Sequence, residues 1–131
     1  MDIESLVTDP ALESEGVWVP IGNGGHIKVA REGNEAYQDY LHGLVTANRA
    51  AIDQDDSASR KLQKQLLARA YAYHILKDVK GIKRGGVEIT SYTPAIGIEL
   101  LSIPDFMKKV QDYAKQMQLF QKKAEDAAVG N

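Results

Sequence analysis

The side chains best suited to acid–base or metal chemistry are the three histidines, His26, His42 and His74. A histidine metal site usually draws on a second histidine three to five positions away or on cysteine, and this chain has neither. Binding through carboxylates stays open but has no support in the spacing. We therefore expect no metal, and we expect His74, on the buried side of a predicted helix, to be a hydrogen-bonded core residue.

Two glycine-rich turns have compositions that can bind an anion. The first, 22–25 (Gly-Asn-Gly-Gly), precedes a predicted strand, whereas a phosphate loop needs a helix N-terminus, so we interpret it as a hairpin turn. The second clusters the cations Lys80, Lys83 and Arg84, which suit an acidic partner or a phosphate backbone. A solvated turn is the commoner role for such a cluster, and both roles stay open.

Catalytic patterns are missing from the sequence. There is no cysteine, and no serine lies in a Gly-x-Ser-x-Gly setting. The acidic segment 53–57 lacks the glycine and the closing glutamate of a calcium loop. We expect a protein that is not an enzyme, with no catalytic residue and no cofactor.

The strongest pattern is an apolar stripe near the end of the chain. Apolar residues recur at steps of four and three from Phe106 to Ala127, with lysine and glutamine between them, which predicts one amphipathic helix. This face either packs on the chain's own helices, which spacing slightly favours, or lies in the groove of a partner. The residues predicted to contact a partner or a second copy are Phe106, Val110, Tyr113, Met117 and Phe120.

The patterns in the rest of the chain predict an α+β fold that is mostly helical. Two β-branched runs flank the Asn23-Gly24 turn, which predicts an N-terminal β-hairpin over 17–31. Pro20 cannot donate a backbone hydrogen bond, so its strand should be an edge. Helices are predicted at about 34–51, 57–76, 94–101 and 104–127.

Capping residues and turn residues set the limits of these helices. Asn34 and the Asp53–Ser57 linker supply N-caps, and Thr93-Pro94 starts the third helix. Residues 77–82 end the second helix, with Gly81 as a left-handed stop, and a small extended hairpin follows. We predict a flexible arm at 1–15, one globular domain at 16–122 and a frayed tail at 123–131.

The length and charge of the chain limit the class of protein further. A chain of 131 residues is one ordinary domain, and its net charge of −2 argues against a general nucleic-acid binder. No apolar run approaches the ~20 residues that span a bilayer, and the acidic start is no secretory signal. We expect a cytosolic protein that does not bind membranes.

The order of landmarks points to a family. They are Glu15–Val19 with the glycine-rich turn, Ile27–Arg31, Leu76–Gly81, Gly86–Ile89, Tyr92–Pro94 and a closing helix that carries Phe120. Over residues 12–122 this order resembles the tail assembly chaperones of long-tailed, siphovirus-type bacteriophages. One position departs from the pattern, since Val79 stands where family members often carry tryptophan.

The resemblance implies a non-enzymatic morphogenesis factor. Such proteins bind the tape-measure protein, recruit the major tail protein, act in the host cytoplasm and are absent from the finished virion. The family also implies a longer form of the protein made by ribosomal frameshifting. We further expect a homo-oligomer that associates through the closing helix and the second helix. Lys122-Lys123 would suit the slippery site if an adenine run encodes it.

Two other functions stay open at this point. One is a structural head–tail connector component of the virion. The other is a small nucleic-acid-binding regulator that uses Lys80, Lys83 and Arg84.

Overall fold

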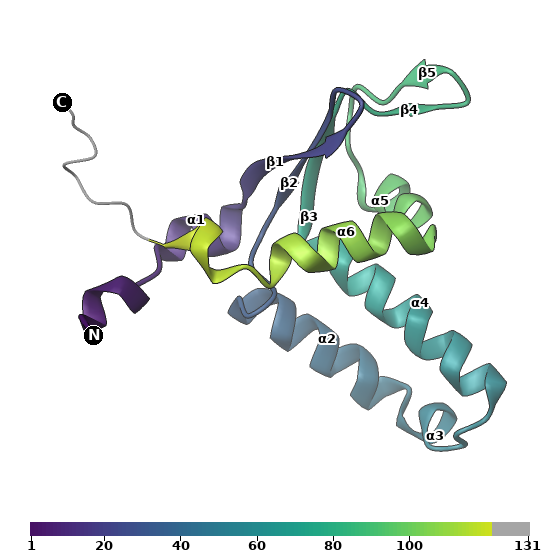
Figure 1. Ribbon diagram of the computed structural model, residues 1–131. Helices are drawn as coiled ribbons and strands as arrows, with labels where there is room; N and C mark the ends of the chain where they lie inside the picture. Colours follow the sequence, from purple (N-terminus) through teal and green to yellow (C-terminus); the bar gives the residue numbers. More distant parts are fainter. Residues whose placement is uncertain (122–131) are drawn as a thin grey trace, which may run out of the picture.

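The computed structural model describes residues 1–121 of the chain. The fold is α+β and mostly helical, with an N-terminal β-hairpin followed by helices, which confirms the predicted class (Figure 1). Lys122, Lys123 and the rest of the predicted tail lie outside the described residues.

The sheet has three antiparallel strands in the order β1 (Val17–Gly22), β2 (Gly25–Val29) and β3 (Leu76–Lys80). The predicted hairpin is confirmed, and so is the edge position of the strand with Pro20. Asn23 and Gly24, the two residues of the turn, both have positive φ, at 52° and 81°. That backbone is a type I′ turn, which matches the twist of a hairpin.

The prediction of a helix through Leu76 is wrong, because the chain turns into β3 directly after α4. Leu76 pairs with Val29, and Val79 pairs with Ile27. The Ala30 N–H also donates to the Ile75 carbonyl at 2.8 Å. These long-range bonds to β2 satisfy backbone groups that a helix would satisfy locally, so tertiary pairing overrides the local helical spacing.

Gly81 has the predicted positive φ, +70°, but it ends a strand rather than a helix. A Cβ added there would lie 2.5 Å from the Gly24 carbonyl oxygen. Gly81 is therefore required by the close approach of β3 to the β1–β2 turn.

The helices α2 (Glu35–Ala47), α3 (Arg49–Ile52) and α4 (Ser57–His74) follow one another, and α2 and α4 lie side by side (Figure 1). The predicted N-caps are confirmed. The Asn34 side chain accepts from the Tyr37 N–H at 2.9 Å, and Asp56 and Ser59 cap each other reciprocally.

A two-stranded hairpin, β4 (Lys83–Arg84) and β5 (Val87–Glu88), leads to α5 (Pro94–Leu101) and α6 (Pro104–Ala114). The Ile89 N–H donates to the Ile82 carbonyl at 2.8 Å, which confirms the small predicted hairpin. Thr93 caps α5 through the Ile96 N–H, as predicted.

The prediction of one closing helix from Phe106 to Ala127 is wrong within the described residues. α6 ends at Ala114, and after Lys115 and Gln116 a 3₁₀ turn, η2, covers Met117–Phe120. The break turns Phe120 into the interior of the fold, where none of its surface is exposed. Burial of one phenylalanine is worth about 2–3 kcal/mol. The lost helical hydrogen bonds are partly replaced, because the Asp9 N–H donates to the Phe120 carbonyl.

The predicted arm at 1–15 contains a 3₁₀ turn, η1 (Ile3–Leu6), and a short helix, α1 (Pro10–Glu15). It is tied to η2, because the Asp9 N–H donates to the Phe120 carbonyl at 2.7 Å and Thr8 forms a β-bridge with Gln121.

The core lies between one face of the sheet and the helices. Val19, Ile27 and Val79 form a buried cross-strand row on that face. Tyr71 and Ile75, at the end of α4 and just beyond it, are fully buried against it, as is Val110 of α6. None of the helices in residues 1–121 is long and apolar enough to cross a membrane.

Candidate partner-binding site

The stripe predicted to bind a partner divides into buried and accessible residues. Val110 and Phe120 have no exposed surface and belong to the chain's own interior. Phe106, Tyr113 and Met117 are partly exposed. For Val110 and Phe120, therefore, the stripe packs on the chain itself and not in the groove of a partner.

Tyr113 lies where α6 meets the sheet edge. Its hydroxyl donates to the Pro20 carbonyl at 2.6 Å, joining residues 93 positions apart. An open groove of about 450 Å³ lies here, lined by Pro20, Ile21, Gly22, Lys109, Asp112, Tyr113 and Gln116. Pro20 removes one donor from this edge and Tyr113 occupies one acceptor, so the edge is poorly suited to pairing with another strand.

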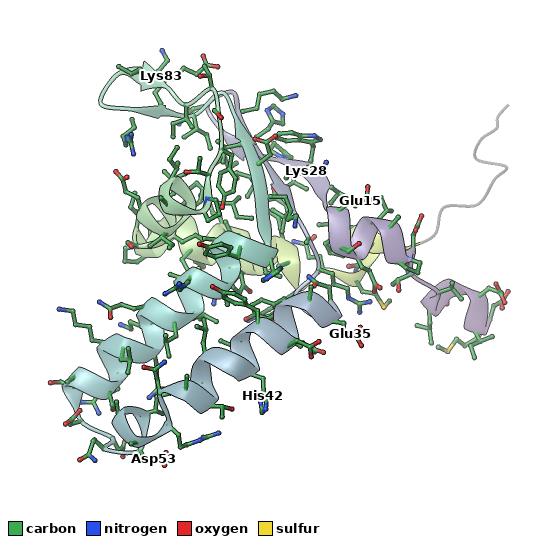
Figure 2. All side chains as sticks on the ribbon, turned by 180° about the vertical axis from the view of Figure 1, so that it is seen from behind. Glu15, Lys28, Glu35, His42, Asp53 and Lys83 are labelled. Carbon is green, nitrogen blue, oxygen red and sulfur yellow. The ribbon has the colours of Figure 1, made fainter. Side chains whose placement is uncertain are left out.

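A second groove, of about 520 Å³, runs along α2 and is the more apolar of the two. It is lined by Glu32, Gly33, Tyr37, Gln38, Leu41, His42 and Val45. Tyr37, Leu41 and Val45 follow one another at intervals of four, so they lie on one flank of the helix. Leu41 and Val45 are partly exposed, whereas Tyr37 is buried and forms the floor. His42 projects outward from α2 (Figure 2).

The end of α6 meets the start of α2 beside this groove. The Glu32 N–H donates to the Ala114 carbonyl at 3.0 Å, and the Tyr71 hydroxyl donates to the Glu32 carboxylate at 2.9 Å. Burial, together with the charge of Glu32, raises the pKa of Tyr37 to about 12 and that of Tyr71 further still. Both tyrosines are therefore neutral and act as structural support for the groove.

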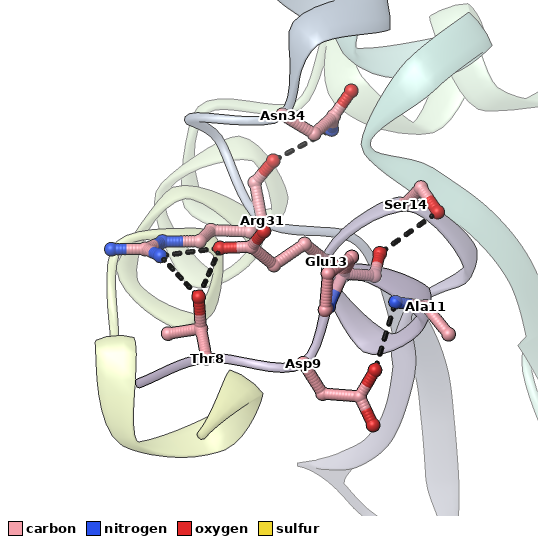
Figure 3. A network of polar contacts seen from close by, with 8 residues as sticks. Thr8, Asp9, Ala11, Glu13, Ser14, Arg31 and Asn34 are labelled. Atoms are coloured by element: carbon pink, nitrogen blue, oxygen red, sulfur yellow. Dashed lines mark hydrogen bonds and ion pairs between the residues drawn. The ribbon is translucent and has the colours of Figure 1, made fainter. Parts of the chain in front are cut away.

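A polar cluster fixes the loop before α2 (Figure 3). Arg31 forms an ion pair with Glu13 of α1 at 2.5 Å, and Thr8 donates to the same carboxylate. Burial of Glu13 opposes its ionisation, but the hydrogen bonds from Arg31 and Thr8 outweigh it and lower its pKa. The Asn34 side-chain amide then donates to the Arg31 carbonyl at 2.7 Å, so α1, the loop and the cap of α2 are linked.

The predicted basic turn is not one continuous patch. Lys80 lies over the Trp18 ring, 4.7 Å from its centroid, and Arg84 forms an ion pair with Glu99 at 2.6 Å. Lys83 is exposed on the β4–β5 hairpin (Figure 2).

The histidines lie apart from one another, on β2, on α2 and at the end of α4. Within residues 1–121, no three His, Cys, Asp or Glu side chains are grouped so that they could hold a metal ion. The prediction that His74 is a core residue is wrong, since it is partly exposed and lies against the Tyr40 ring with centroids 4.9 Å apart. Burial and the nearby Lys77 lower its pKa.

Sequence reasoning missed the α2 groove as a candidate site. The signal was present, because the helix over 34–51 carries more apolar residues than one contact face needs, with Leu41 and Val45 beside Tyr40 and Leu44. It was not assigned because spacing does not show which part of a wide apolar face a neighbouring helix covers. In the structure, Tyr40 stacks on Tyr73 of α4, which leaves the other flank open.

Comparison with known families identifies the chain as a protein of phage origin. The sequence profile described as YdaY prophage protein matches residues 32–131. The chain belongs to this family. No curated protein and no solved structure matches the chain significantly.

Proposed function

We propose that this YdaY family protein is a non-enzymatic tail assembly chaperone that binds and shields the tape-measure protein. In this proposal it recruits the major tail protein, acts in the host cytoplasm beside a longer frameshifted form of itself, and is absent from the mature virion. The phage origin of the family and the resemblance over residues 12–122 support the proposal.

The observation that carries the proposal is the open apolar groove on α2. Leu41 and Val45 are partly exposed on one flank of the helix, above the buried ring of Tyr37. A tape-measure protein is a long helical chain with apolar residues that aggregate unless they are covered. A groove along a helix suits an amphipathic helix that offers residues at intervals of three and four.

The closing stripe has a secondary part in this proposal. Tyr113 and Met117 are partly exposed at the end of α6 and just beyond it, near the place where Glu32 joins Ala114. In the proposal they add a second contact area at the end of α6, and Phe106 offers a partly exposed ring near the start of that helix. Val110 and Phe120 hold α6 and η2 in place from beneath.

Co-purification of the full chain with the tape-measure protein tests the proposal. We expect the wild type to bind at micromolar concentration and the double variant Leu41→Asp/Val45→Asp to lose binding at least about tenfold, because two charges enter an apolar contact. The matched control is Ala36→Asp/Ala47→Asp, which places the same charges on α2 at exposed positions outside the groove. Circular dichroism checks that all the variants are folded. Absence of wild-type binding contradicts the proposal. Equal binding by both double variants contradicts the assignment of the contact to the α2 groove.

A nucleic-acid-binding regulator is the second candidate, favoured only by the exposed Lys83 on the β4–β5 hairpin. We expect no salt-dependent gel shift, because the chain has a net charge of −2 and Arg84 is paired with Glu99. Mass spectrometry of purified particles separates a chaperone from a head–tail connector, since only the connector remains in the virion.

A further inference from the structure

The outer face of the three-stranded sheet has no covering element among residues 1–121. Residues that alternate with the buried ones form two cross-strand rows on this face, Trp18–Lys28–Asp78 and Pro20–His26–Lys80. All six are exposed or partly exposed, in contrast to the buried row on the inner face. Figure 2 shows Lys28 on the sheet.

This face combines an apolar surface with positive charge. The Trp18 side chain is 41% exposed, and the Lys80 ammonium lies 4.7 Å from its ring centroid. Lys28 and Lys80 outnumber the one carboxylate of the two rows, Asp78. A complementary ligand would therefore offer apolar side chains and carboxylates together.

Residues 1–7 have that composition. Asp2 and Glu4 alternate with apolar residues that are strongly exposed: Met1 at 97%, Ile3 at 71% and Leu6 at 46%. The bridge of Thr8 with Gln121 and the bond from the Asp9 N–H to the Phe120 carbonyl hold the base of this segment. The Gln121 side chain also donates to the Ser5 carbonyl, and the charged and apolar side chains of the segment stay exposed. It consequently projects from the body away from the sheet (Figure 1).

We propose that residues 1–7 of one copy dock on the outer sheet face of a second copy. Ile3 and Leu6 cover Trp18, while Asp2 and Glu4 approach Lys28 and Lys80. The contact is head-to-tail, because it joins two different surfaces. In a pair, one copy still has a free segment 1–7 and the other a free sheet face, so further copies can be added. This inference does not depend on tape-measure binding. It is favoured over a nucleic acid because the segment supplies apolar side chains as well as negative charge.

The oligomeric state of the full chain, measured by light scattering after size exclusion over a range of concentrations, tests the proposal. We expect the mass to rise with protein concentration and to rise less at high salt, because the attraction between the charges is screened. Lys28→Glu/Lys80→Glu should lose this rise, and so should Asp2→Lys/Glu4→Lys. An equal mixture of these two variants should regain it, because each segment then meets a face of opposite charge.

The matched control is Lys61→Glu/Lys64→Glu, which changes two exposed lysines on α4 and should associate like the wild type. Circular dichroism verifies the fold of each variant. A wild-type monomer at every concentration, or a mixture that stays monomeric, overturns the proposal. A single-stranded oligonucleotide that binds the wild type but not Lys28→Glu/Lys80→Glu, without self-association, also overturns it and assigns the face to nucleic acid.

Discussion

Tyr71 links the core to the start of α2 through a single hydroxyl. The ring is fully buried and packs edge-on against Tyr37 with centroids 5.4 Å apart, and its hydroxyl donates to the Glu32 carboxylate at 2.9 Å. We predict that Tyr71→Phe lowers the free energy of unfolding by about 1.5 kcal/mol, because a hydrogen bond to a carboxylate is lost. Urea denaturation measures the change. Tyr73→Phe, at a side chain that is 42% exposed, should change it by less than about 0.5 kcal/mol.

The neighbouring Tyr37 makes stability depend on pH in the alkaline range. Its pKa in the folded protein is raised to about 12 by burial and by Glu32. The raised pKa means that folding favours the neutral ring, so this contribution is complete below the unfolded pKa of about 10 and is lost as the pH rises through 12. We predict a falling free energy of unfolding between about pH 10 and about pH 12, measured by urea denaturation. The fall should be smaller in Tyr37→Phe, and an equal fall in both proteins would contradict this assignment.

At the scale of elements, one glycine sets the distance between α4 and α5. A Cβ at Gly97 would lie 2.1 Å from the Tyr92 hydroxyl, which donates to the Ala72 carbonyl at 2.6 Å. We predict that Gly97→Ala lowers the free energy of unfolding by about 2 kcal/mol, because the ring must move and its hydrogen bond is strained.

Gly43 is the matched control, since it lies inside α2 with no atom within 4 Å of an added Cβ. Gly43→Ala should raise the free energy of unfolding by about 0.5–1 kcal/mol, because alanine loses less backbone entropy in a helix. If both variants respond alike, the packing of α4 on α5 does not depend on the close approach at Gly97.

Local signals were sufficient for the elements whose limits are set by neighbouring residues. The Asn23-Gly24 turn and the caps at Asn34, in the Asp53–Ser57 linker and at Thr93 each act within three or four positions, and the sequence predicts each of them. β3 and the end of α6 could not be predicted in this way. Leu76 leaves the helix to pair with Val29, and Phe120 leaves its stripe to enter the core, so both depend on partners far along the chain.

The candidate site was predictable only in part for the same reason. The sequence shows that the stripe from Phe106 to Phe120 is apolar, but not what it covers. In the structure α6 covers the sheet that β3 completes, and Val110 is buried there. The accessible apolar flank is consequently on α2, where the contacts of Tyr40 with α4 decide which residues remain open.

At the scale of the whole molecule, the α2 groove and the outer sheet face lie on different elements, whereas the second groove shares Pro20 with that face. Leu41 and Val45 lie on α2, whereas Trp18 and Lys80 lie on β1 and β3. The two proposed contacts, one with a partner and one between copies of the chain, therefore use different residues. Such an arrangement would allow a row of subunits to cover a long helical protein.

The central claim is that this protein shelters an aggregating polypeptide, and light scattering of the tape-measure protein diluted from denaturant tests it most directly. We predict that an equimolar amount of the wild type suppresses most of the scattering, and that Ala36→Asp/Ala47→Asp does so equally well. Leu41→Asp/Val45→Asp should leave the scattering near the level seen without chaperone. Scattering that is the same with and without the wild type would contradict the claim.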